Sequence, residues 1–200
     1  MKKTLLLLLL AIASLGNAMA QHEPWDIYIT PKVGATYSNF RGVDGGKYKL
    51  GFIGGANLEV FITPAVAFDT ELSFSHQGSH NYINPETQMQ NDARVNLLNF
   101  DFMFRFYPIR SIPRLSLFSG LHGAYVAWFK VNYRDIRDEV HGGDIGVPVG
   151  IGYEVGKVAI DAKYNFSARK IAHTEMAKHN LGDATHSAFM LTVGYKIQVF

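Results

Sequence analysis

Apolar and polar residues alternate one by one over most of the chain after residue 21. In the clearest run, residues 98–106, Leu98, Phe100, Phe102, Phe104 and Phe106 alternate with Asn99, Asp101, Met103 and Arg105. Segments 66–74, 145–155, 158–166 and 189–199 repeat the pattern, and segments 27–39, 48–62 and 115–130 follow it less regularly. Alternation with a period of two is typical of β-strands that have one apolar face. The pattern therefore predicts eight strands.

The predicted connections alternate between long and short. The long polar segments are 40–47, 77–93, 131–143 and 170–186, and the short ones are 63–64, 107–114 and 156–157. An antiparallel meander of this kind can close by pairing its first strand with its last, which removes the exposed edges of the sheet. We therefore predict an all-β fold, an eight-stranded antiparallel up-and-down β-barrel.

The two faces of the predicted strands differ in a way that favours a membrane. The apolar face carries bulky residues in unbroken rows, whereas the polar face carries Gly, Ser, Asn and charges of both signs. An eight-stranded barrel has room inside only for packed side chains, and strands of about 10–13 residues match a bilayer. We predict a transmembrane barrel with its termini and short turns in the periplasm and its long loops outside. A secreted soluble barrel or sandwich is the alternative.

Aromatic residues near the predicted strand ends support the membrane interpretation. Such positions suit the two membrane–water interfaces, where aromatic rings form belts. We assign to these belts Trp25, Tyr37, Phe40, Tyr107, Trp128, Phe129, Tyr133, Tyr153 and Phe166.

The first twenty residues have a different character. Lys2 and Lys3 precede an apolar run over residues 5–13, and residues 18–20 read Ala-Met-Ala. This is the organisation of a secretory signal peptide, and the apolar run is shorter than the roughly 20 residues of a spanning helix. We expect residues 1–20 to be a signal peptide and residues 21–200 to form the outer-membrane barrel domain.

Composition narrows the function classes. The 200 residues include 19 Lys and Arg and 17 Asp and Glu, so the two signs balance once Lys2 and Lys3 are removed. A chain without excess positive charge is a poor candidate for nucleic-acid binding. The sequence contains no cysteine, which excludes disulfides, thiolate metal sites and cysteine nucleophiles.

The inward phase of the strands predicts a lumen of mixed charge. Buried charges must pair, so we expect an ion-paired plug that keeps the barrel rigid, with a proton- or ion-conducting path as the alternative. The predicted network comprises Glu59, Asp69, Glu71, Asp101, Arg105, Glu154, Asp161, Lys163 and Lys196. The further inward bases are Lys32 and Lys130.

Histidine and serine residues near the predicted outer loops raise two further possibilities. His76, His80, His141, His173, His179 and His186 could bind zinc, copper or haem, but they lack tight ligand spacing, and we expect them to be solvated. We expect His122 to be a hydrogen-bonded core histidine. A lipid hydrolase at the rim could use Ser75-His76, Ser79-His80 or His186-Ser187. Neighbouring residues of a strand point to opposite faces, so we name no catalytic, cofactor-binding or metal-binding residue.

Several segments resemble a family of small bacterial outer-membrane β-barrels labelled porin-family or PorT-like. Residues 144–154 with Gly156-Lys157 and residues 159–165 resemble its Gly-x-Gly-Tyr-Glu hairpin followed by Asp-x-Arg/Lys-Tyr. Further similarity covers Glu71-Leu72 with Ser75, Gln77 and Gly78, residues 96–101 with Arg105, Phe118-Ser119-Gly120, and Gly194-Tyr195-Lys196. The chain differs from the family at Asn99 and Asp101, where the family often has Glu and Pro. It also ends in Phe200, which falls in the inward phase, whereas such barrels commonly end in an outward aromatic residue.

The resemblance implies a bacterial outer-membrane location and a mixed range of functions. We expect a non-enzymatic barrel with a polar, plugged lumen that acts as an envelope scaffold or as a loop-mediated binding or secretion-associated component. The alternatives are a narrow porin or transport channel for small solutes and a lipid hydrolase at the rim. The expected partners are outer-membrane lipid, the barrel-assembly machinery and an extracellular or secretion-system protein that contacts the loops. We expect a monomer without a cofactor and without nucleic acid.

Overall fold

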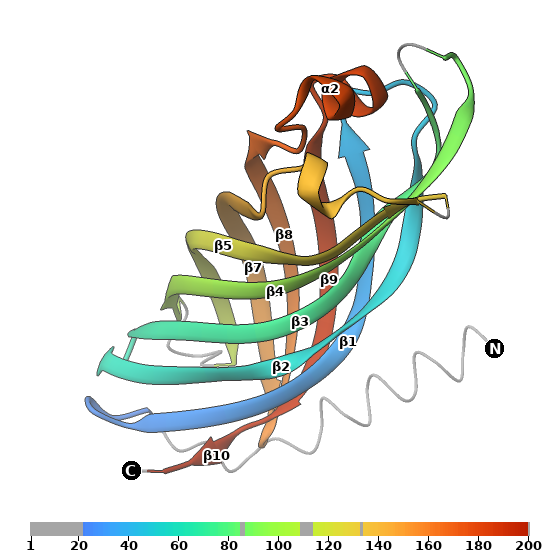
Figure 1. Ribbon diagram of the computed structural model, residues 1–200. Helices are drawn as coiled ribbons and strands as arrows, with labels where there is room; N and C mark the ends of the chain where they lie inside the picture. The colour runs from blue at the N-terminus through green and yellow to red at the C-terminus, as the bar shows by residue number, and fades with distance from the viewer. Residues whose placement is uncertain (1–21, 85–86, 109–113, 133, 200) are drawn as a thin grey trace, which may run out of the picture.

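The computed structural model describes residues 22–84, 87–108, 114–132 and 134–199, and it forms a closed β-barrel (Figure 1). The predicted signal peptide and Phe200 lie outside the described residues. The eight long strands are β1 (Ile27–Arg41), β2 (Lys47–Thr63), β3 (Val66–Ile83), β4 (Gln90–Phe106), β5 (Leu115–Val131), β7 (Gly143–Val155), β8 (Val158–Lys170) and β9 (Thr185–Tyr195). The shorter elements are β6 (Arg134–Asp135), the 3-10 helix η1 (Arg137–Glu139), the helix α2 (Glu175–Leu181) and β10 (Ile197–Gln198).

The long strands pair antiparallel in chain order, and the first strand pairs with the last. β1 and β9 meet along a register that runs from Lys32 opposite Gly194 to Arg41 opposite Thr185. β10 extends the seam by pairing with β1, while β6 is an additional short strand beside β5. The predicted eight-stranded antiparallel barrel is therefore confirmed.

The exterior of the barrel is apolar. Leu50 is 72% exposed, Phe104 is 58% exposed and Phe102 is 55% exposed, and the two phenylalanines belong to the apolar row predicted for residues 98–106. Rows of large exposed apolar side chains around a closed barrel suit contact with hydrocarbon. Within the described part of the chain, no helix is long and apolar enough to span a membrane.

The two ends of the barrel differ in their connections. The short turns lie at the end where β1 begins and β10 ends, and the β3–β4 hairpin and α2 lie at the opposite end (Figure 1). The Thr174 hydroxyl caps α2 by accepting a hydrogen bond from the Ala177 N–H at 3.2 Å. We refer to the end that carries α2 as the outer mouth.

β3 and β4 extend furthest beyond their predicted bounds. β3 continues to Ile83 and β4 begins at Gln90, so most of segment 77–93, predicted as a loop, is a projecting hairpin. Strand alternation arises when one face is apolar, and this hairpin is rich in polar residues. Its sequence therefore carries no period-two signal although its backbone is paired.

A bulge in β5 reverses the inward and outward faces near the outer mouth. Leu97 pairs with Val126 and Asn96 pairs with Trp128, so Ala127 is the extra residue. Beyond the bulge Phe129 faces inward and Lys130 is exposed, and the prediction that Lys130 faces the lumen is wrong.

The structure contradicts part of the aromatic assignment. Trp25, Tyr37, Trp128 and Phe166 are exposed, and Tyr153 is half-buried. Phe40, Tyr107 and Phe129 are buried inside the barrel, so their assignment to the membrane interfaces is wrong. The reason is strand phase: Phe40 shares the inward phase of Ser38, and Tyr107 shares that of Arg105. Tyr133 lies outside the described residues.

Candidate functional site

The barrel interior contains every one of the nine charged residues predicted for the network, each of them buried. They lie in three tiers between the short-turn end and the outer mouth. In the lowest tier the Lys196 Nζ lies 2.6 Å from Glu59 Oε2 and 2.7 Å from Glu154 Oε1. The Tyr107 hydroxyl lies 2.6 Å from Glu59 Oε1 and 2.7 Å from Glu154 Oε1. Two carboxylates from β2 and β7 therefore share a lysine and a phenol.

His22 closes the lowest tier from below. Its ring stacks on Phe61, with centroids 4.0 Å apart and planes inclined by 15°, and its Nε2 lies 3.7 Å from Glu154 Oε2. Tyr28 packs edge-on against the same imidazole at 5.4 Å. The first described residue of the chain thus lies inside the barrel among aromatic side chains.

Arg105 forms the centre of the middle tier. Its Nη1 and Nη2 donate to the two oxygens of Asp161 at 2.9 and 3.2 Å, and its Nε donates to Asp69 Oδ2 at 3.0 Å. Nη1 also donates to the Ser116 hydroxyl at 2.9 Å, and the guanidinium carbon lies 4.4 Å from the centre of the Phe118 ring. A planar fork suits this arrangement because it can bind one carboxylate with two bonds and still reach others.

Two lysines and a histidine build the upper tier. The Lys32 and Lys163 ammonium groups lie 2.6 and 2.9 Å from the two oxygens of Glu71. Lys163 also donates to Asp101, whose Oδ1 lies 2.5 Å from His122 Nδ1. His122 is a buried, hydrogen-bonded core residue.

The three tiers form one continuous network. Arg105 Nε lies 3.8 Å from Glu59 Oε1, which joins the lower tier to the middle one, and Lys32 Nζ lies 3.5 Å from Asp161 Oδ2, which joins the middle tier to the upper one. Charges removed from water are strongly destabilising unless each is paired and hydrogen-bonded. The arrangement satisfies this requirement by linking side chains from strands that are distant in the sequence.

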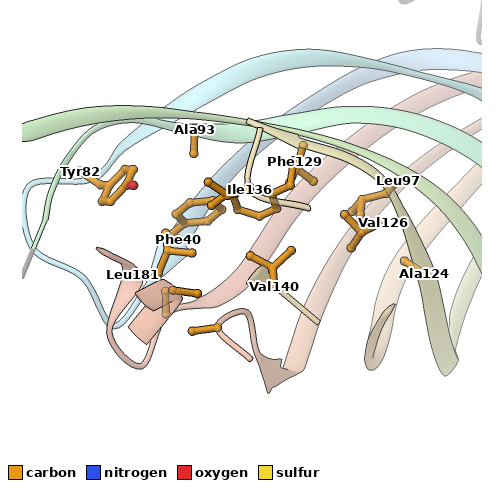
Figure 2. Close-up of a cluster of buried hydrophobic side chains, with 14 residues drawn as sticks. Phe40, Tyr82, Ala93, Leu97, Ala124, Val126, Phe129, Ile136, Val140 and Leu181 are labelled. Carbon is orange, nitrogen blue, oxygen red and sulfur yellow. The ribbon is translucent and has the colours of Figure 1, made fainter. Parts of the chain in front are cut away.

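An apolar cluster occupies the barrel above the charged tiers (Figure 2). We call it the apolar cap; it consists of Phe40, Tyr82, Ala93, Val95, Leu97, Ala124, Val126, Phe129, Ile136, Val140, Ala172, Ala177, Leu181 and Ala184. Figure 2 shows Phe40, Phe129 and Ile136 grouped together, and the Phe40 and Phe129 rings stack with centroids 6.0 Å apart. Residues from the two long outer connections thus fold back into the barrel, because burial removes their apolar surface from water.

A small cavity lies beside the apolar cap. Its volume is about 30 Å³, enough for about one or two water molecules. Val95, Leu97 and Phe129 contribute apolar walls, while Asp144 and His186 contribute polar groups. The His186 Nε2 is buried without a hydrogen-bond partner among the described residues.

The projecting β3–β4 hairpin is organised by one carboxylate. Asp92 Oδ1 accepts a hydrogen bond from the Asn81 N–H at 3.0 Å, and Oδ2 lies 3.2 Å from His80 Nδ1. The bond from the Asn81 N–H, followed by the contact with His80, lowers the pKa of Asp92. Asn81 has a φ of 52°, a left-handed conformation that asparagine adopts more readily than most residues.

The remaining outer histidines occupy different surroundings. His76 stacks on Phe52 with centroids 5.9 Å apart, and its Nδ1 lies 2.6 Å from Asn96 Oδ1. His186 is buried, which contradicts the expectation that it is solvated, because β9 turns it inward beside Phe40. His141 and His173 contact each other, with ring centroids 4.6 Å apart. Among the described residues, no three His, Asp or Glu side chains form a metal-binding group.

The Ser–His neighbours point to separate partners. Ser75 accepts a hydrogen bond from Gln77, and Ser79 donates to Asn39, whereas His76 and His80 contact Asn96 and Asp92. The Ser187 hydroxyl donates to the Asn39 carbonyl. In the part of the chain that the structure describes, none of these serines bonds to its neighbouring histidine.

Sequence reasoning missed two members of the lowest tier. Tyr107 was assigned to the membrane interface, although its phase, shared with Arg105 two residues earlier, points inward. The sequence therefore contained a signal that Tyr107 faces the lumen. His22 precedes the first strand, and no periodic pattern covers that position.

The chain is similar to known outer-membrane β-barrels. Residues 5–196 match the model of the family described as outer membrane protein beta-barrel domain. The solved structure of Neisserial surface protein A, NspA, is 15% identical, with 86% of this chain and 97% of that chain covered and a TM-score of 0.55. The structure of Ail, the attachment invasion locus protein of Yersinia pestis, in complex with the heparin analogue sucrose octasulfate is 14% identical, with 86% and 99% covered and a TM-score of 0.51. A search of curated proteins gave no significant match.

Proposed function

Because the chain belongs to the outer membrane protein β-barrel domain family, whose members lie in the bacterial outer membrane, we propose that it is a closed scaffold whose outer loops bind a partner. The observation that carries the proposal is the filled interior. The charged network and the apolar cap follow one another along the barrel, and both are built from buried side chains. A static pore for solutes would require a hydrated path through both layers.

The charged network opposes the rival hypothesis of a narrow channel. An ion that passes Arg105 would have to displace its bonds to Asp69 and Asp161, which are buried and mutually compensating. Breaking such a pair leaves an uncompensated charge and costs about 3–5 kcal/mol. The interior therefore favours rigidity over permeation.

Single-channel conductance in a planar bilayer tests this proposal. We expect the refolded full-length barrel to insert without steady conductance steps, with insertion verified by the heat-dependent gel mobility of the folded barrel. A matched control replaces one compensating pair, Arg105→Ser with Asp161→Ser, which keeps the net lumen charge and removes side-chain volume. Defined conductance steps from the unmodified protein would contradict the scaffold and favour the channel.

The outer loops support the binding half of the proposal. The apolar cap holds η1 and α2 against the barrel, so the outer surface is arranged before a partner arrives. Preorganised loops lose less conformational entropy on binding. The similarity to Ail, an attachment protein solved with a heparin analogue, is compatible with such a role.

Site-specific crosslinking on intact cells tests where a partner binds. The chain has no cysteine, so a single cysteine that replaces the exposed Lys178 on α2 can carry a photo-crosslinker. The matched control places the cysteine at the exposed Lys157 in the β7–β8 turn, at the opposite end of the barrel. We expect a discrete crosslinked species from position 178. The same species from position 157, or from neither position, would contradict loop-mediated binding.

A further inference from the structure

Two outer connections are joined beside the apolar cap. Val140 and Ala172 form an antiparallel bridge, and both side chains are buried in the cap. The residues that follow them, His141 and His173, are half-buried and exposed, respectively. The His173 N–H donates to the Glu139 carbonyl at 3.2 Å, so backbone bonding fixes the distance between the segments.

The two imidazoles are close enough to share one ligand. Their ring centroids lie 4.6 Å apart, and their planes are inclined by 54°, which is neither stacked nor perpendicular. A metal–nitrogen bond of about 2.0–2.1 Å places each ring centroid about 3.2 Å from the metal. Two imidazoles bound at angles between 90° and 109° therefore have centroids about 4.5–5.2 Å apart. The observed separation of 4.6 Å falls in this range.

We propose that His141 and His173 form a binding site for a divalent transition-metal ion of the zinc or copper class at the outer mouth. Neutral imidazole is a good ligand for both metals. No third His, Asp or Glu completes a cluster within the described residues, so water fills the other coordination positions. Arg169 borders the same cavity as His141, and its positive charge limits the affinity.

A metal at this position would act as a clip between two loops. His141 follows η1 and His173 precedes α2, and the two residues are 32 positions apart in the chain. One ion bound to both would hold the two long outer connections together above the apolar cap. This inference is independent of whether the barrel acts as a scaffold or a channel, because it concerns only the outer surface.

Titration of the refolded full-length barrel with zinc tests the site. We expect one saturable zinc site in calorimetry, and a loss of affinity of about tenfold or more in His141→Gln and in His173→Gln, since a single imidazole cannot chelate. Zinc should also slow proteolysis at Arg134 and Arg137 in the unmodified protein and not in either variant. The second readout detects the loop clip directly, without reference to any activity.

Two other outer histidines serve as matched controls. His80 contacts Asp92, and His179 is exposed on α2. We expect His80→Gln and His179→Gln to bind zinc like the unmodified protein. The proposal is overturned if the unmodified protein shows no saturable site, if His141→Gln and His173→Gln bind unchanged, or if a control substitution abolishes binding instead.

Discussion

Arg105 connects three parts of the barrel wall through one side chain. It extends from β4 to Asp69 on β3 and to Asp161 on β8, and it rests on Phe118 of β5. A neutral side chain at this position would leave two carboxylates buried without their main counter-charge. The position is therefore a sensitive probe of the charged network.

We expect Arg105→Met to reduce the free energy of unfolding by about 3–5 kcal/mol, the usual cost of breaking a buried ion pair from one side. Urea unfolding in lipid vesicles, followed by fluorescence of the two tryptophans, measures the change. Arg169→Met, at an exposed position of the outer mouth, is the control and should leave the midpoint unchanged. Equal effects of the two substitutions would show that the network contributes nothing specific.

Asp92 makes the hairpin sensitive to acid. The pKa of Asp92 is lowered in the folded state. Its contribution to the stability of the hairpin is therefore fully present above the unfolded-state pKa of about 3.9 and is lost as the pH falls through the lower folded-state pKa. We expect the protection factor of the Asn81 amide hydrogen, which corrects the exchange rate for its intrinsic pH dependence, to fall below about pH 4, and Asp92→Asn to remove this pH dependence. Because Asp92 is partly exposed, solvent screens the effect and we expect it to be small. An Asn81 amide that exchanges with the same pH profile in the variant would refute the assignment.

Residue-scale prediction from the sequence depended on strand phase. Alternation placed all nine network residues inward, because an unbroken strand sends every second side chain to the same face. It could not identify which acid meets which base, since those contacts cross the lumen between strands such as β1 and β8. His22 was beyond reach because stacking on Phe61 is a tertiary contact without a local signal.

At the scale of elements, the β5 bulge decides which residues meet the apolar cap. Deleting Ala127 would place Trp128 directly after Val126, so simple alternation without a bulge would still turn Phe129 toward the cap and Lys130 outward. We expect a cysteine at position 130 to react with a water-soluble maleimide whether or not Ala127 is present, and a cysteine at position 129 to stay unlabelled in both cases. Ala127→Gly keeps the chain length and should retain full labelling. A deletion that exposes position 129 and protects position 130 would refute the assignment of Ala127 as the extra residue.

The lengths of the strands could be predicted only within the apolar belt, which is the part of the barrel whose exterior carries the rows of exposed apolar side chains. There one face contacts hydrocarbon, and the resulting alternation defined strands such as 98–106. The β3–β4 hairpin extends beyond the belt, where both faces are polar and the backbone pairing leaves no trace in hydropathy. The helix α2 was missed as well, because its seven residues are too few to show a helical period.

For the whole molecule, the sequence predicted that the barrel closes, that its apolar face points outward and that the protein lies in the outer membrane. The number of alternating segments predicted the barrel, and the bulky residues of the apolar rows predicted that these rows face outward and not into the lumen. The apolar cap did not follow, because it joins residues from β1, β3, β4 and β5 to two outer connections that are polar on average. Its formation depends on long-range packing, which a periodicity argument does not address.

Lys196 links closure of the barrel to neutralisation of two buried acids. It stands after the last long strand, yet it neutralises Glu59 and Glu154, which belong to strands made much earlier. An incomplete sheet would hold these two acids without their lysine and would gain little by excluding water from its interior. Pairing of β1 with β9 and exclusion of water from the lumen are therefore coupled in a single cooperative event.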